Sequence, residues 1–135
     1  MVIASSDNKK HVDVGNYTIW HAVYSTVICR LNDSERLFPD AIDFLETGKC
    51  EPDMAQKTAR QINLIRDHLA LIPPEEAVYD NDHPHIDAPW KNRISPVVTS
   101  CANLFTTADG KDLLFEIVSI LVYASIAKIS VETNS

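Results

Sequence analysis

The stretch YDNDHPHIDAPW, residues 79–90, concentrates side chains that could do chemistry. Three aspartates and two histidines lie within it: Asp80, Asp82, His83, His85 and Asp87. Carboxylates and imidazoles bind zinc, manganese or iron, and the spacing of the two histidines would let both rings point the same way from an extended strand. Aspartate and proline are equally common where a surface chain bends. The stretch therefore predicts a metal site, a solvated turn or an acidic surface for a partner.

The acidic character extends upstream of this stretch. Five acidic residues and no lysine or arginine lie between positions 75 and 87, and such a field attracts a basic partner. The residue Trp90 follows, and it either pins the loop to the body or anchors a partner. We therefore predict a partner-binding site, with no metal and no catalytic residue. Its members are Glu75, Glu76, Asp80, Asp82, Asp87 and Trp90. The alternative is a small metal-dependent enzyme that uses the Asp/His loop 80–87.

The composition limits the partners and reactions open to the chain. Nineteen acidic and twelve basic residues give a net charge of −7, which disfavours nucleic acid as a partner. Only three glycines occur, so there is no glycine-rich loop to bind phosphates, and we expect no cofactor. The first residues lack the pattern of a signal peptide, which predicts a cytoplasmic location.

Apolar residues that recur every three or four positions predict about five helices. The expected helices span residues 17–31, 39–47, 52–72, 96–105 and 112–128. Asn16 suits the N-cap of the first, and Ser95-Pro96 resembles the start of the fourth. The fifth is apolar almost all round, which predicts a core helix or one shared with a partner, a homodimer being one alternative. Glu116 interrupts it, and it is too short to span a membrane.

The two ends of the chain predict a small β element. Residues 2–15 favour a short strand or extended arm that ends at Gly15, and residues 129–132 alternate apolar and polar side chains as a strand beside it would. Four of the seven prolines lie between residues 73 and 92, which predicts a long irregular loop of functional importance. We expect one domain over residues 1–135, mainly α, with a minor β element pairing the N- and C-terminal segments.

Several short motifs, in succession, resemble one known family. They are Val14-Gly15, Ser25-Thr26, Phe38-Pro39, Leu45-Glu46-Thr47-Gly48, Pro73-Pro74, Val78-Tyr79-Asp80-Asn81-Asp82, Pro89-Trp90, Ile94-Ser95 and Asn103-Leu104-Phe105-Thr106-Thr107-Ala108-Asp109-Gly110-Lys111-Asp112-Leu113. Together they cover most of the chain. The family is the bacterial immunity protein 70 family, small cytoplasmic proteins encoded beside polymorphic toxin genes.

This resemblance implies a non-enzymatic antitoxin whose partner is the C-terminal domain of a cognate toxin. Such a protein blocks the active site or the substrate path of a contact-delivered or secreted effector. Many of these toxins are basic because they cleave nucleic acid, and an acidic protein would bind them quickly by electrostatic steering. We expect Asp80, Asp82 and Asp87 to contact basic toxin residues, and Trp90 to pack at or under the loop.

Overall fold

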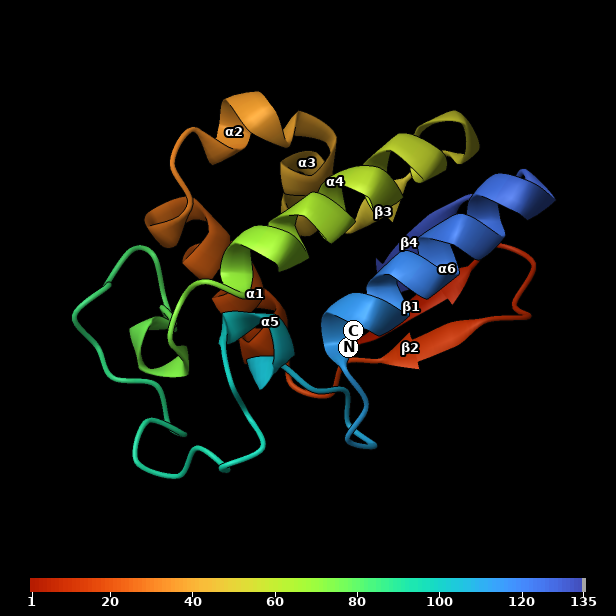
Figure 1. Ribbon diagram of the computed structural model, residues 1–135. Coiled ribbons are helices and arrows are strands. Elements are labelled where there is room, and N and C mark those ends of the chain that lie inside the picture. The colour runs from red at the N-terminus through yellow and green to blue at the C-terminus, as the bar shows by residue number, and fades with distance from the viewer. Residues whose placement is uncertain (135) are drawn as a thin grey trace.

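Six α-helices and a four-stranded sheet make up the computed structural model, which describes residues 1–134 (Figure 1). The helices are α1 (Tyr17–Arg30), α2 (Ser34–Leu37), α3 (Pro39–Thr47), α4 (Ala55–Leu69), α5 (Cys101–Leu104) and α6 (Leu113–Ala127). Two single 3-10 turns, η1 (Pro52–Met54) and η2 (Pro74–Glu76), precede and follow α4. The prediction of a mainly helical fold is confirmed, with the four-residue α2 as an additional helix.

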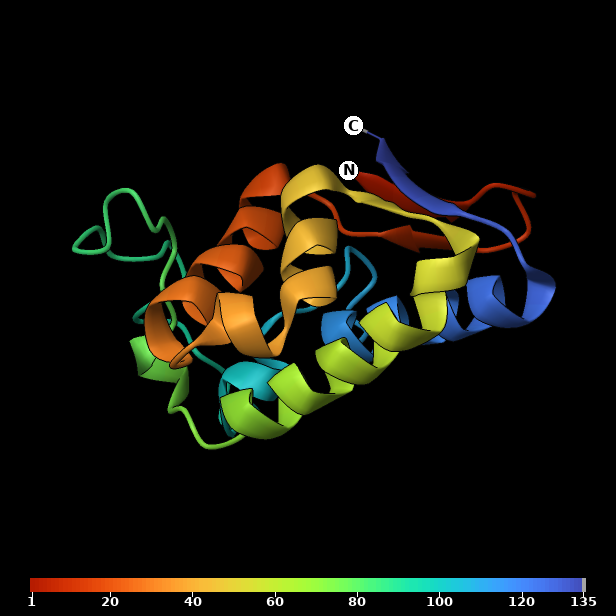
Figure 2. The same cartoon turned by 90° about the horizontal axis from the view of Figure 1, so that it is seen from above.

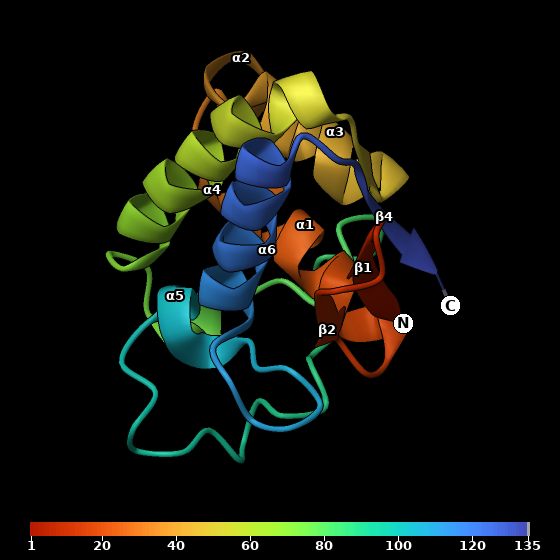
Figure 3. The ribbon, with the colours of Figure 1, turned by 90° about the vertical axis from the view of Figure 1, so that its right-hand side faces the viewer.

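The core lies among α4, α6, α3 and α1, with α4 packed on α6 and on α3, and α3 packed on α1. Figure 3 shows α4 and α6 side by side, and Figure 2 shows α1 beside α3. The apolar faces predicted for these helices meet there: Ile62 and Ile65 of α4, with Ile117 and Leu121 of α6, are fully buried. The α6 helix is therefore a core helix, as its apolar composition predicted.

The sheet is antiparallel with strand order β2-β1-β4-β3. Its strands are β1 (Val2–Ser5), β2 (His11–Asp13), β3 (Lys49–Cys50) and β4 (Val131–Asn134). Ile3 of β1 lies opposite Thr133 of β4, which confirms the predicted pairing of the terminal segments. The β1–β2 hairpin and the two-residue β3 were not predicted, because each strand is too short to show a clear alternation.

The predicted fourth helix is wrong over its first half. Residues 96 and 97 form a turn, residues 98–100 are irregular, and α5 starts only at Cys101, after an N-cap at Ser100. Ser95 does begin a turn, in which its carbonyl accepts from the Val98 amide, but the turn does not continue. Val97 is 78% exposed, and a β-branched run with no apolar face to bury gives little support to a helix.

Residues 77–99 connect η2 to α5 without a helix or a strand. This confirms the long irregular loop that the prolines predicted. Figures 1 and 2 show the green part of the connection at one end of the molecule and the sheet at the other end. The candidate site is built on this segment.

Candidate functional site

Two buried hydroxyl groups of α1 hold the start of the loop. The Thr26 hydroxyl accepts from the Val78 amide at 3.0 Å and donates to the Val78 carbonyl at 3.2 Å. The Ser25 hydroxyl accepts from the Asn81 amide at 2.9 Å and donates to Asn81 Oδ1 at 3.2 Å. Both hydroxyl-bearing residues are fully buried. The backbone of residues 78–81 is thus fixed to α1 much as a strand is fixed to its neighbour.

Asp80 bonds inward through both oxygens. Its Oδ1 lies 3.1 Å from His21 Nε2 of α1 and accepts from the Asp82 amide at 3.0 Å. Its Oδ2 lies 3.2 Å from His83 Nδ1. These bonds, the one to His21 first among them, lower the pKa of Asp80 from 3.8 to about 2. His21 is isolated in the sequence, and no sequence pattern pointed to its place beside Asp80.

Trp90 fastens the far side of the loop to the core. Its ring lies edge-on to Tyr79, with centroids 5.6 Å apart, and edge-on to Phe105, at 6.2 Å. Phe105 is buried, whereas Trp90 is partly exposed. The two roles considered for Trp90 are therefore compatible: the indole pins the loop and still presents a surface.

The other predicted acidic residues lie exposed, Glu75 and Glu76 in η2 and Asp82 and Asp87 in the loop that follows it. Asp87 forms an ion pair with Lys91, whose Nζ lies 2.8 Å from its Oδ1. Arg30 also reaches the segment from the end of α1, where its Nε donates to the Glu76 carbonyl at 2.7 Å. Both cations lie outside residues 75–87, so the sequence analysis missed them.

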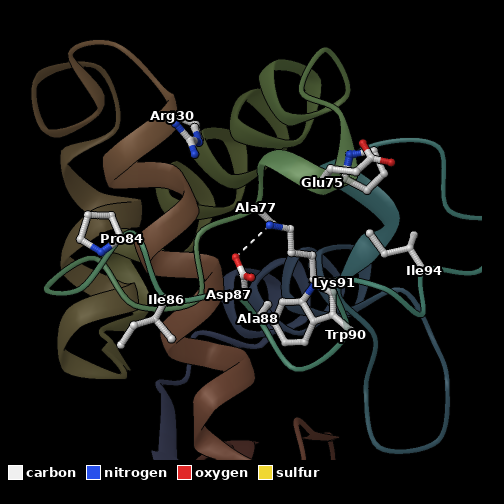
Figure 4. A pocket seen from close by; sticks show the side chains of 11 residues that line it. Arg30, Glu75, Ala77, Pro84, Ile86, Asp87, Ala88, Trp90, Lys91 and Ile94 are labelled. Atoms are coloured by element: carbon white, nitrogen blue, oxygen red, sulfur yellow. Dashed lines mark hydrogen bonds and ion pairs between the residues drawn. The ribbon is translucent and has the colours of Figure 1, made fainter.

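A hollow of about 160 Å³ forms between the loop and the end of α1 (Figure 4). Of the predicted site residues, the structure brings Glu75, Asp87 and Trp90 together in its wall, with Arg30 and Lys91. Trp90 also lines a second, more apolar hollow of about 290 Å³ with Ile94, Val98, Leu104 and Phe105. The remaining members of the predicted site (Glu76, Asp80 and Asp82) line neither hollow. The arrangement offers a partner separate charged and apolar contacts beside one indole ring.

Comparison with known protein families identifies the chain. The sequence model of the family described as Immunity protein 70 matches residues 5–133. The chain belongs to the immunity protein 70 family. Searches of curated proteins and of solved structures found no significant match.

Membership of the immunity protein 70 family implies a protein that gives immunity to a toxin by binding it. It suggests a role other than catalysis. Three of the motifs that carried the resemblance meet at the site: Ser25 and Thr26 hold residues 78–81, and Trp90 packs on Tyr79. All of these contacts fix the position of the loop.

No metal centre is assembled in the part of this immunity protein 70 chain that the structure describes. The ring centroids of His83 and His85 lie 6.4 Å apart with the rings steeply inclined, and His83 turns toward Asp80. Across residues 1–134 no group of three or more His, Cys, Asp or Glu side chains is placed to hold a metal ion. The geometry thus gives the metalloenzyme alternative no support.

The apolar α6 does not have the dimensions of a membrane span. Its 15 residues correspond to about 22 Å, whereas a bilayer core is roughly 30 Å thick. Among residues 1–134 we find no helix whose length and hydropathy would allow it to cross a membrane.

Proposed function

We propose that this chain is a cytoplasmic immunity protein that neutralises the C-terminal domain of a cognate polymorphic toxin, a basic nuclease. Family membership supports the antitoxin role, and the net charge of −7 supports a basic partner. In this proposal the toxin docks on residues 75–90 and on the hollows beside them. Delivery of the toxin by cell contact fits the same scheme.

The observation that carries the proposal is an exposed acidic segment on a fixed backbone. Residues 78–81 are tied to α1 by four hydrogen bonds of Ser25 and Thr26, and Trp90 holds the return of the loop. A preorganised loop loses little conformational entropy when it binds, so more of its contact energy becomes affinity. A loop that served only as a solvated turn would not need these anchors.

Each predicted residue then has a distinct part. Glu75, Glu76, Asp82 and Asp87 face solvent and would pair with lysine or arginine of the toxin. Asp80 adds charge to the same surface, but since both its oxygens bond inside the molecule, its part is to hold the loop. Trp90 would form the desolvated centre, between the charged hollow and the apolar one.

A charge-matched pair of triple variants tests the location of the surface. The first replaces Glu75, Asp82 and Asp87 by their amides. The control replaces Asp43, Asp53 and Asp67, which are also exposed and lie outside the loop. Both variants change the net charge by the same amount, so a general field effect is the same in each.

We expect the loop variant to bind the toxin domain at least tenfold more weakly, roughly 1.4 kcal/mol, with a shallower dependence of the association rate on salt. The control variant should bind nearly as the native chain does. Surface plasmon resonance at several salt concentrations measures both quantities. Equal losses in the two variants would mean that the loop is not the docking surface.

A further inference from the structure

The outward face of α6 carries an exposed apolar stripe, and at its first residue the Arg66 guanidinium lies over the Phe115 ring, 5.6 Å from the centroid. Phe115, Val122 and Ile126 are 51%, 43% and 78% exposed, and Ser119 lies between them. Successive residues of the stripe, from Phe115 to Ile126, are four, three and four positions apart, which is the spacing of a coiled-coil seam. The opposite face of α6 fills the core, so this helix is apolar on two sides.

Charges of both signs lie at each end of the stripe. Arg66 lies over Phe115 at one end, and toward the other end Asp7 Oδ2 accepts from the Tyr123 hydroxyl at 2.6 Å. Glu116 lies one residue after Phe115, near the start of α6. Toward the other end of the stripe, Lys10 lies over the Tyr123 ring, with its Nζ 5.5 Å from the centroid. Glu116 and Lys10 line one shallow hollow with Val122 and Ile126, yet within residues 1–134 neither charge forms an ion pair.

We propose that the α6 stripe binds a second copy of this chain, with the two α6 helices antiparallel about a two-fold axis. That axis would pass midway between Ser119 and Val122, which lie equally far from the two ends of the stripe. Phe115 of each copy then meets Ile126 of the other, and the small Ser119 lets the helices approach closely. Glu116 of each copy lies toward Tyr123 and Lys10 of the other, which gives two equivalent ion pairs.

Antiparallel packing also aligns the two helix dipoles favourably, whereas in a parallel pair Glu116 of each copy would lie at a different level along the seam from Lys10 of the other. A second copy is therefore the occupant that the charges favour. The inference does not rest on the proposed toxin binding, since Trp90 and the acidic loop lie on other elements. It requires only that the native chain is dimeric at concentrations above its dissociation constant.

Mixing two charge variants tests this arrangement. In homodimers of Glu116→Lys, or of Lys10→Glu, both ion pairs become like-charge contacts, and we expect the dissociation constant to rise about tenfold or more. In an equimolar mixture every contact pairs opposite charges again, so a heterodimer with close to native affinity should form. Sedimentation equilibrium over a concentration series measures the dissociation constant of each variant and of the mixture. Neither replaced side chain belongs to the buried core, so we expect both variants to fold.

A second pair of variants tests the apolar seam. Ile126→Lys should abolish the dimer, whereas Leu71→Lys, at an exposed apolar position just past α4, should leave it unchanged. A native chain that stays monomeric at every concentration, or a mixture that forms no heterodimer, would overturn the proposal. A third result would also overturn it: an Ile126→Lys variant that has the same oligomeric mass as the native chain but no longer binds the toxin. The stripe would then be the docking site of the toxin and not of a second copy.

Discussion

Asp80 illustrates how one side chain can be misread from its neighbours in sequence. Among Asp82, His83 and His85 it has the context of a metal ligand or of an exposed charge. In the structure its partners are the Asp82 amide, His83 and His21, the last of which lies 59 residues away along the chain. Only the fold brings His21 to this position, so no local pattern could have assigned Asp80 its anchoring role.

The bonds of the Asp80 carboxylate predict how the stability of the fold depends on pH. The pKa of Asp80 is about 2 in the folded chain and about 3.9 in an unfolded one. Because folding lowers this pKa, Asp80 contributes stability above about pH 4, and that contribution is lost as the pH falls toward 2. We expect the Asp80 carboxyl carbon to titrate near pH 2 in an NMR experiment.

Replacing His21 identifies the cause of this low pKa. His21→Ala removes the largest contribution, so the midpoint of the Asp80 titration should move up toward its ordinary value. His85→Ala serves as the control, because His85 contacts His83 but makes no bond to Asp80. An unchanged midpoint in His21→Ala would show that the contact with α1 does not hold the carboxylate.

At the scale of elements, the helices with a long apolar period were predictable, and the short elements depended on contacts distant in sequence. The spacing of apolar residues located α1, α3, α4 and α6, since each buries one continuous face. The start of α5 could not be located in this way. It is fixed by Asn103 Oδ1, which accepts from the Thr99 and Ser100 amides, and by the Cys101 amide, which bonds the Ile72 carbonyl.

The start of α3 depends on a side chain of another helix. Its N-cap, Phe38, supplies no side-chain oxygen. Gln61 of α4 fills that role: its Oε1 accepts from the Asp40 and Ala41 amides at 2.9 and 3.0 Å, and its Nε2 donates to Asp40 Oδ2 at 2.8 Å. Because Gln61 is buried, its amide both caps α3 and joins it to α4.

We predict that Gln61→Met destabilises the chain by about 2 kcal/mol, because two amides at the start of α3 lose their acceptor. Urea denaturation followed by circular dichroism measures the free energy of unfolding. Gln56→Met is the matched control, since Gln56 lies exposed on the same helix. A loss of the same size in both variants would contradict the capping role.

At the scale of the whole molecule, two surfaces lie on different parts of one helical body. The loop that carries the acidic residues lies at the end away from the sheet, and α6 runs toward the β1–β2 hairpin (Figure 1). Trp90 belongs to that loop, and the stripe belongs to α6. A dimer formed through α6 would therefore keep both acidic loops available to toxin. The composition predicted an acidic surface but not its anchors, since a residue's charge can be read from the sequence and its partners in space cannot.

The central claim is that this chain neutralises a toxin by binding it. The most direct measurement is co-expression of the chain with the C-terminal domain of the large protein encoded immediately upstream, scored by growth and by co-purification. We predict that the toxin domain alone stops growth, that the chain restores it, and that the two purify as a stable complex. Arrested growth despite soluble, folded chain, with no complex recovered, would contradict the account.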